Sequence, residues 1–430
     1  MSTAVQAHPL QHNRSIGRRL VAVTGAIVLL LIGLITLLII GAEVGPIGLV
    51  TGLVLATVPL PLYLGLALWI DRFEPEPIRM LSWAFFWGAT AATFFALILN
   101  TVGQSVVSSE FGSSFGEVYG SSISAPVVEE SAKGFVLLAI YRFRRSELNG
   151  VLDGIVYASM VGLGFATTEN ILYYGNAAAG DGVPLEATFF MRGVLSPFAH
   201  PVFTAMTGIG FGIAVASGRP LRRLAPFVGL VGAMLLHSLW NSSATVGDGL
   251  GFVGVYFLIM IPIFVAVIVI SIVARRREGR MVSDQLQPEL ASGQLTGEDV
   301  QSLSSVKARK RAVKDAKRGG LQDGRKQFQE VATELAFLRH RMAKGAKHAR
   351  GVDPVAEESL LRGQMLGLRA GLPGAPAGVL APAPAVEAGS PAAAPPVAAQ
   401  TTAPGWYADP WGQARVRFWD GSSWTGHTEA

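Results

Sequence analysis

The chain has 430 residues, of which 50% are hydrophobic, no cysteine, a mean hydropathy of +0.42 and a formal net charge of +5. Recurring apolar stretches of bilayer-spanning length exclude a water-soluble globular protein, and the lack of cysteine excludes disulfides, thiolate metal ligands and thiol nucleophiles. The positive charge comes from one segment, residues 275–350, which holds 18 Lys and Arg against 9 Asp and Glu.

Eight apolar segments predict an all-α polytopic membrane protein. They are residues 20–42, 45–70, 81–102, 121–141, 150–173, 187–217, 224–244 and 252–274. The first follows Arg14, Arg18 and Arg19, and no small-residue cleavage site precedes the second. We therefore expect the first segment to be an anchor that the mature chain keeps, rather than a removed signal peptide.

Basic residues between these segments predict the orientation of the chain. They occur in every second loop: Arg14, Arg18 and Arg19; Arg72 and Arg79; Arg142, Arg144 and Arg145; Arg219, Arg222 and Arg223; Arg275, Arg276 and Arg277. The loops 43–44, 103–120, 174–186 and 245–251 hold no Lys or Arg. Because Lys and Arg are retained in cytoplasmic loops, we expect a multi-pass plasma-membrane protein with both termini, including the tail 1–19, in the cytoplasm.

A basic segment, residues 276–370, follows the predicted transmembrane domain, residues 20–275. It is expected to be largely helical, because apolar side chains recur at three- and four-residue spacing, and two glycines interrupt it upstream. The apolar residues are Phe328, Val331, Leu335, Leu338 and Met342, and the glycines are Gly319 and Gly320. Such a segment lies against anionic lipid or forms a small helical hairpin. Nucleic-acid binding is disfavoured, because no recognised fold or aromatic interleaving accompanies the charge.

Residues 371–404 consist mainly of Ala, Pro and Gly with almost no charge, a composition typical of a disordered linker. Residues 405–430 hold four of the eight tryptophans: Trp406, Trp411, Trp419 and Trp424. Turn signals at Asp409-Pro410 and Asp420-Gly421 flank a β-type run over 414–419, which predicts a hairpin-based minidomain.

The sequence of this minidomain, with GWYADP, FWDG and WT, resembles a short Trp-rich module of unknown function found mainly at the ends of actinobacterial membrane proteins. The resemblance implies an actinobacterial source. A tethered aromatic module is more often a docking element than an enzyme, so we expect residues 405–430 to recruit a cytoplasmic partner.

Candidate catalytic residues begin in segment 121–141, which reads APVVEESAKGF around Glu129, Glu130 and Lys133. On a helix Glu129 and Lys133 lie one turn apart, and Glu130 is three residues from Lys133. One carboxylate can therefore be ion-paired while the other serves as a general base. The alternative is a buried Glu/Lys pair that only fixes helix register, and this segment alone favours neither interpretation.

The next three segments each add polar groups that hydrocarbon disfavours. They are Phe165, Glu169 and Asn170; His200, beside Pro197 and Pro201; and His237, Trp240 and Asn241. An isolated His or Asn in a membrane helix usually forms an interhelical hydrogen bond. However, an ionised group in hydrocarbon costs about 2.5–3.5 kcal/mol, and the prolines predict a kink beside a cavity. Counting from the basic loops places the acidic and histidine side chains between the bilayer midplane and its outer third, which predicts one outward-facing site.

These motifs, EExxK from Glu129, FxxxEN from Phe165, the lone His200 and HxxWN from His237, resemble the signatures of the PrsW family of intramembrane proteases. That family is related to the CAAX prenyl endopeptidases and the abortive-infection membrane proteins. The loop 71–77, DRFEPEP, also resembles the PEP-containing loop of the family. The CAAX enzymes usually have a histidine where this sequence has Glu169.

The resemblance implies a membrane endopeptidase of metallopeptidase type that acts in signal transduction. It would cleave membrane-anchored proteins, such as anti-sigma factors, near the extracytoplasmic side of the lipid bilayer. In one mechanism Glu129, or as second choice Glu130, is the base, Lys133 tunes the pair, and His237 and Asn241 stabilise the oxyanion.

In the other mechanism a divalent ion, most simply Zn²⁺, is held by Glu169, His200 and His237 and a glutamate of the first motif is the base. Phe165, Asn170 and Trp240 would support either site. No HExxH motif occurs.

Two other classes stay open. Membrane-embedded Glu, His and Lys also build proton relays, so a proton-coupled transporter fits these residues, although no paired half-repeat is visible. A non-catalytic membrane scaffold that retains the motifs is the third interpretation.

Overall fold

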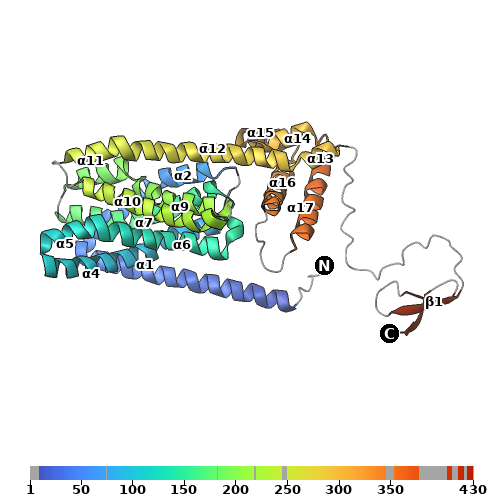
Figure 1. Cartoon of the computed structure of the whole chain (residues 1–430), viewed down its shortest axis with the longest axis horizontal. Coiled ribbons are helices and arrows are strands. Elements are labelled where there is room, and N and C mark those ends of the chain that lie inside the picture. The colour runs from blue at the N-terminus through green and yellow to red at the C-terminus, as the bar shows by residue number, and fades with distance from the viewer. Residues whose placement is uncertain are drawn as a thin grey trace. The chain divides into compact units, whose positions relative to one another are not determined.

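The computed structural model describes residues 9–73, 75–181, 183–216, 219–244, 249–344, 353–376, 404–408, 415–420 and 424–429. The chain divides into a large helical unit, residues 1–381, and a small unit, residues 382–430. Figure 1 shows the helices of the large unit in chain order.

The large unit begins with α1 (Pro9–Thr57), α2 (Leu60–Ile70), α3 (Ile78–Trp87), the π-helical η1 (Gly88–Ala92), α4 (Thr93–Phe111), α5 (Ser113–Tyr119), the π-helical η2 (Gly120–Ser124) and α6 (Ala125–Phe143). It continues with η3 (Arg145–Glu147), α7 (Val151–Ala179), α8 (Leu185–Phe189), the π-helical η4 (Phe190–Leu195), α9 (Ala199–Ala216), α10 (Arg219–Ser243), α11 (Leu250–Val255), the π-helical η6 (Tyr256–Met260) and α12 (Ile261–Gln285). The last helices are α13 (Gln287–Ala291), α14 (Gly297–Leu303), α15 (Val306–Lys317), α16 (Gln322–Ala343) and α17 (Pro354–Ala370).

The expected all-α polytopic membrane fold is confirmed. Six helical runs among the described residues are long and apolar enough to cross a membrane: 20–70, 78–111, 151–179, 185–216, 221–243 and 250–285. The difference from eight has two physical reasons. The first run contains two expected segments, because α1 bends at Gly45, whose φ is 71°. The expected segment 121–141 is helical as well, but its charged residues, Glu129, Glu130 and Lys133, lower its hydropathy.

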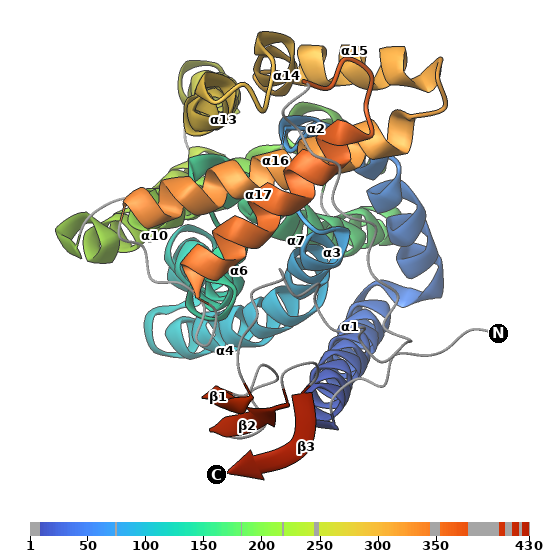
Figure 2. The same cartoon turned by 90° about the vertical axis from the view of Figure 1, so that its right-hand side faces the viewer.

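Helix α7 lies at the centre of the large unit, packed against α1, α3 and α9 (Figures 1 and 2). Two glycines permit this close packing. A Cβ at Gly154 would lie 2.1 Å from the carbonyl oxygen of Gly208, and one at Gly164 would lie 2.0 Å from that of Phe85. Small residues let membrane helices approach closely. The backbone of α7 is therefore held at a fixed depth beside α9.

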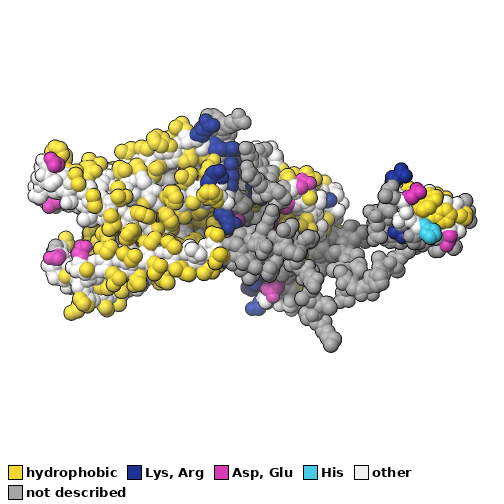
Figure 3. Space-filling view, turned by 90° about the horizontal axis from the view of Figure 1, so that it is seen from below, with side chains coloured by type: hydrophobic (Ala, Val, Ile, Leu, Met, Phe, Trp, Pro, Cys, Tyr) yellow, Lys and Arg dark blue, Asp and Glu magenta, His cyan; other side chains and the backbone are white. Residues whose placement is uncertain are grey.

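The surface of the large unit is apolar along its long helices (Figure 3). On α1, for example, Leu30, Leu34 and Leu38 are all exposed. Lys and Arg side chains gather at one end of this apolar surface (Figure 3). An apolar belt with basic residues at one end fits a bilayer-embedded body, and the positive-inside rule predicts that this end faces the cytoplasm.

Helices α13–α17 and the end of α12 form a bundle with its own apolar core. The core includes Phe328, Leu335 and Leu338 of the predicted apolar stripe, and the two predicted interrupting glycines, residues 319–320, lie between α15 and α16. The helical prediction is thus confirmed, although a hairpin describes only α16 and α17. The core also takes in Phe73, from the loop between α2 and α3, which is 1% exposed.

The small unit is an antiparallel sheet of strands β1 (Gly405–Ala408), β2 (Val416–Trp419) and β3 (Trp424–Glu429), in the order β1-β2-β3. Trp406 pairs with Phe418 across β1 and β2, with ring centroids 5.4 Å apart. The predicted β-type minidomain is confirmed, with a third strand beyond the expected hairpin. The turn signal at 409–410, Trp411 and residues 377–403 of the predicted linker lie outside the described residues. The start of that linker is not a free tether as expected, because Leu372 packs in the core of the α13–α17 bundle.

Candidate active site

Neighbouring helical segments bring the ionisable residues of the four predicted motifs into one buried cluster. The contributors are Glu129, Glu130 and Lys133 from α6, Phe165, Glu169 and Asn170 from α7, Arg192 from η4, His200 and Thr204 from α9, and His237 from α10. Glu130, Lys133 and Thr204 are 0% exposed. Buried charges are tolerated only when protein groups satisfy them, so the partners of each side chain define the site.

Lys133 is the centre of the cluster. Its Nζ lies 2.8 Å from Glu130 Oε1, 3.3 Å from Glu129 Oε2 and 2.9 Å from His200 Nδ1. The same ammonium lies 3.8 Å from the centroid of the Phe165 ring. One cation thus joins both carboxylates of the first motif to a histidine on another helix.

The two carboxylates of that motif have different surroundings. Glu130 accepts hydrogen bonds from Lys133, from His237 Nδ1 at 3.0 Å and from the Thr204 hydroxyl at 3.2 Å, so both of its oxygens are engaged. Among the described residues the polar partners of Glu129 are both at Oε2: Lys133 and, at 4.0 Å, His237 Nε2. Among the described residues Glu129 Oε1 has no hydrogen-bond partner, so Glu129 is the carboxylate that remains available to a water.

Hydrogen bonding assigns a tautomer to each histidine. An ammonium can only donate, so His200 Nδ1 accepts from Lys133 and the ring proton lies on Nε2, 2.7 Å from Glu169 Oε2. Glu130 is ionised beside Lys133, so His237 Nδ1 donates to it and Nε2 carries the lone pair. Each histidine therefore gives its N–H to a carboxylate and keeps one basic nitrogen.

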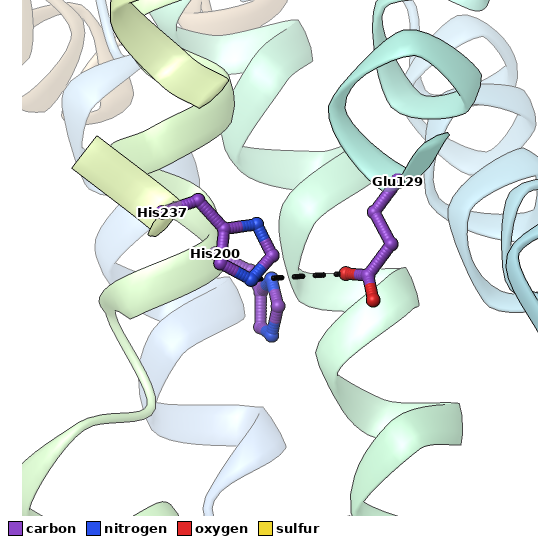
Figure 4. A group of neighbouring side chains, drawn as sticks. All are labelled: Glu129, His200 and His237. Carbon is purple, nitrogen blue, oxygen red and sulfur yellow. Dashed lines mark ion pairs between the residues drawn. The ribbon is translucent and has the colours of Figure 1, made fainter. Parts of the chain in front are cut away.

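Glu129, His200 and His237 point toward one another from α6, α9 and α10 (Figure 4). One ligand atom from each lies within 4.8 Å of the others, which identifies this triplet as a candidate metal site among the described residues. Imidazole nitrogens and a carboxylate oxygen are the donors that catalytic zinc sites use, and both rings have a second carboxylate on the other nitrogen. The donor set therefore fits a divalent ion. The expected set had Glu169 in the place of Glu129.

Glu169 has a different set of contacts. The Arg192 guanidinium donates from Nη2 to Glu169 Oε2, the oxygen that also accepts from His200. Arg192 Nε donates to Asn170 Oδ1 at 2.6 Å, and the guanidinium lies 3.8 Å from the centroid of the Tyr173 ring. Glu169 is thus held by a cation and a histidine N–H.

A cavity of about 20 Å³ adjoins His200, enough for one water molecule. Its lining consists of Ala166, Asn170, Arg192, Ser196, Pro197, Ala199, His200 and Trp240. The helix is interrupted between η4 and α9 at Pro197, next to this space, whereas Pro201 lies in the first turn of α9. The cavity gives water a place beside the cluster.

Other predicted site residues lie outside the hydrogen-bonded cluster. Asn241 Nδ2 donates to the backbone carbonyl of Ser121 at 2.8 Å, at an exposed position. Trp240 packs on Phe252 with ring centroids 4.7 Å apart, and it lines the cavity next to His200. Arg192 was absent from the sequence-based prediction, although an arginine inside the apolar segment 187–217 was a visible signal.

A second group of buried carboxyls lies in the loop after α2. Asp71 Oδ2 accepts from the backbone N–H of Glu76 at 2.9 Å, and Tyr157 donates to Glu76 Oε2 at 2.5 Å. Burial raises the pKa of Asp71 to about 7, even though the bond from Glu76 N–H lowers it. The PEP-containing loop is therefore fixed to α7 by hydrogen bonds, separately from the cluster around Lys133.

Comparisons with known proteins agree with these motifs. A family model described as PrsW family intramembrane metalloprotease matches residues 76–267, and one described as a protein of unknown function (DUF2510) matches residues 404–430. The chain is 32% identical over 171 residues to "Protease PrsW" of Bacillus subtilis, covering 40% of this chain and 72% of that protein.

Two further relatives carry the same name. That of Geobacillus kaustophilus is 32% identical over 34% of this chain and 58% of its own length. That of Clostridioides difficile is 27% identical over 42% of this chain and 75% of its own. No solved structure matches the chain significantly.

Proposed function

The chain belongs to the PrsW family of intramembrane metalloproteases, which confirms the resemblance in its motifs, and is therefore a membrane endopeptidase. From this premise we propose that it cleaves membrane-anchored proteins close to the extracytoplasmic side of the bilayer, with an anti-sigma factor as substrate. The observation that carries the proposal is the convergence of Glu129, His200 and His237, buried in the membrane domain. The basic residues at one end of the apolar surface support the orientation.

Glu129 is the proposed water-activating residue. Its Oε1 has no hydrogen-bond partner among the described residues, whereas Glu130 is engaged on both oxygens. Glu129 would take a proton from the attacking water and return it to the leaving amine. Glu130 would instead orient His237, and Lys133 would keep Glu130 ionised.

The residues that would hold a metal are His237 through Nε2, Glu129 through Oε2 and, once the Lys133 ammonium no longer occupies its lone pair, His200 through Nδ1. When bound, a divalent ion such as Zn²⁺ supplies an acidified water and polarises the scissile carbonyl. With its proton on Nδ1, His237 has no N–H at Nε2 to give to an oxyanion, so we assign it to binding. Asn241 has no role in this arrangement.

The catalytic assignment can be tested by quantitative mapping of peptide termini in membranes. Cells would carry the wild-type chain or Glu129→Gln, with Glu117→Gln as matched control, because Glu117 is exposed on α5 of the same helical run. Termini that appear with the wild type and the control should fall about 10²–10⁴-fold with Glu129→Gln. Equal termini in all three strains, at equal expression, would refute the proteolytic assignment.

The metal assignment has a separate readout. Purified full-length protein in nanodiscs is titrated with Zn²⁺, and the bound metal is measured by elemental analysis. His237→Asn should lose the ion, whereas His340→Asn, a change in the α13–α17 bundle, should retain it. Equal metal content in the wild type and His237→Asn would contradict the proposed ligand set.

A further inference from the structure

Arg192 is a guanidinium inside an apolar helical run, where a charge is costly and is retained for a reason. Two of its nitrogens donate hydrogen bonds to side chains of α7. Nη2 donates to Glu169 and Nε donates to Asn170, while its face lies on the Tyr173 ring. Its side chain is 24% exposed and that of Glu169 is 17% exposed, so the pair is shielded from water on most sides. The pair is thus held in one geometry by contacts on several sides.

The Arg192–Glu169 pair contacts His200 at Nε2, the ring nitrogen that carries the proton. The ring donates Nε2–H to the same Glu169 oxygen that accepts from Arg192. Lys133 fixes the opposite nitrogen as an acceptor. If Glu169 were turned away, only the bond from Lys133 would favour the proton on Nε2, so the tautomer with its proton on Nδ1 would become more populated.

The other histidine is held in the same way. Lys133 and Thr204 fix Glu130, and Glu130 accepts the N–H of His237. In both cases a cation fixes a carboxylate, and the carboxylate fixes a ring tautomer. The same arrangement therefore occurs twice in one cluster, which argues for a role in orienting both rings.

We propose that Arg192 is a positioning residue that holds Glu169 so that His200 keeps its proton on Nε2 and presents the Nδ1 lone pair to the cluster. This inference rests on the proposed function only in taking that lone pair to be the ligand. Arg192 also borders the cavity next to His200, and its Nη1 forms no hydrogen bond among the described residues. Direct contact with substrate is thus the competing role, and the experiment separates the two.

The test uses full-length protein in nanodiscs and the variants Arg192→Gln and Arg192→Lys. Arg223→Gln is the matched control, because Arg223 is an exposed arginine that forms no ion pair among the described residues. The first readout is the ¹⁵N spectrum of labelled histidine without added metal, with the His200 signals identified by their loss in His200→Asn. The second readout is Zn²⁺ affinity by titration, and thermal unfolding checks the fold of each variant.

We expect the wild type and Arg223→Gln to show a neutral His200 ring with its proton on Nε2. Arg192→Gln should give a mixture of tautomers and bind Zn²⁺ about 10–100-fold more weakly, the usual effect of losing an outer partner of a ligand. Arg192→Lys keeps one cationic donor for Glu169 and should recover most of the wild-type tautomer. If Arg192→Gln does not fold, Asn170→Ala is the second variant, because it removes the partner of Arg192 Nε and leaves the charge of Arg192 in place. It should change the tautomer ratio and the Zn²⁺ affinity in the same direction as Arg192→Gln, but less.

An unchanged tautomer and unchanged Zn²⁺ affinity in folded Arg192→Gln would overturn the proposal. A rise in KM at constant kcat with the wild-type tautomer would also overturn it and assign Arg192 to substrate. The tautomer readout does not depend on proteolysis. A wild type that neither binds Zn²⁺ nor cleaves peptides would therefore refute the proposed function while leaving the positioning of His200 to be judged by its spectrum.

Discussion

Neutralising Glu289 should lower the free energy of unfolding of the α13–α17 bundle more than a substitution of any exposed residue in that bundle. Glu289 is 0% exposed, and two arginines converge on its carboxylate. Arg339 donates to both oxygens at 2.8 Å, and Arg362 Nε donates to Oε1 at 2.8 Å. These bonds join α13 to α16 and α17, so they connect three helices through one buried charge.

The magnitude follows from what a glutamine can replace. The amide oxygen of Glu289→Gln can keep the two bonds at the Oε1 position, but its NH₂ group would face a donor of Arg339. Breaking a buried ion pair from one side costs about 3–5 kcal/mol. The Arg362 side chain is 42% exposed, so water can hydrogen-bond to its guanidinium where the carboxylate no longer does. We therefore expect a loss in the free energy of unfolding at the low end of this range, about 3 kcal/mol.

The same bonds predict a pH dependence. Although burial opposes it, the hydrogen bonds from Arg339 and Arg362 lower the pKa of Glu289 below its ordinary value. A carboxyl with a lowered folded-state pKa stabilises the fold fully above its unfolded pKa of about 4.3, and this stabilisation is lost as the pH falls through the folded value. The bundle should thus weaken below about pH 4, and Glu289→Gln should lack this part of the pH dependence.

The assay is urea-dependent hydrogen exchange of α16 peptides in full-length protein in nanodiscs, at pH 7 and at pH 3. Glu330→Gln is the matched control, since Glu330 is exposed on α16 and has no ion pair among the described residues. If Glu289→Gln and Glu330→Gln shift the urea midpoint equally at pH 7, the buried pairs do not stabilise the bundle as argued.

Three further changes test the packing of the large unit. Phe73→Ala should destabilise the α13–α17 bundle by about 3–5 kcal/mol, seen as faster hydrogen exchange in α16, and unchanged exchange would show that the loop does not belong to that core. Thr204→Val is isosteric and leaves a buried carboxylate oxygen without its hydroxyl donor, so thermal unfolding should report a loss of about 1–3 kcal/mol, and a neutral result would contradict that bond. Gly208→Ala would place a Cβ 2.1 Å from the carbonyl oxygen of Gly154 and should abolish the folded protein in size-exclusion chromatography, whereas Gly254→Ala, in open space, should not; equal yields would refute the close packing of α7 and α9.

The sequence predicts well what depends on periodicity and depth. Apolar length identifies the membrane helices, and counting from the basic loops places Glu129, His200 and His237 at similar depth. The structure brings these three within 4.8 Å of one another. Depth is fixed by the rise of 1.5 Å per residue, which every helix shares, and so it can be read without coordinates.

Which partner each side chain takes is a different matter, because it depends on rotation about the helix axis. The π-helical segment η4 changes the phase of its run, and with it the direction of Arg192. That residue binds Glu169, which the sequence had suggested as a metal ligand. Asn241 is a second example, since one turn beyond His237 its side chain donates to the backbone of Ser121.

Contacts between distant segments are also hidden from the sequence. Phe73 lies in a short loop of the membrane domain, yet it packs in the core of the α13–α17 bundle. Arg309 of α15 donates to its carbonyl and lies 4.8 Å from its ring. Helical periodicity predicts the apolar stripe of α16, but no pattern in the loop indicates which core its phenylalanine joins.

The charges of the cluster indicate where its chemistry lies. Three carboxylates, Glu129, Glu130 and Glu169, face two cations. Lys133 lies nearer Glu130, at 2.8 Å, than Glu129, at 3.3 Å, and Arg192 binds Glu169. With both histidines neutral, the uncompensated negative charge falls on Glu129, which is also next to the ring nitrogens that keep their lone pairs. A buried negative charge attracts a divalent ion or a proton from water. This charge distribution supports the proposal that water is activated beside Glu129 for attack on a peptide bond.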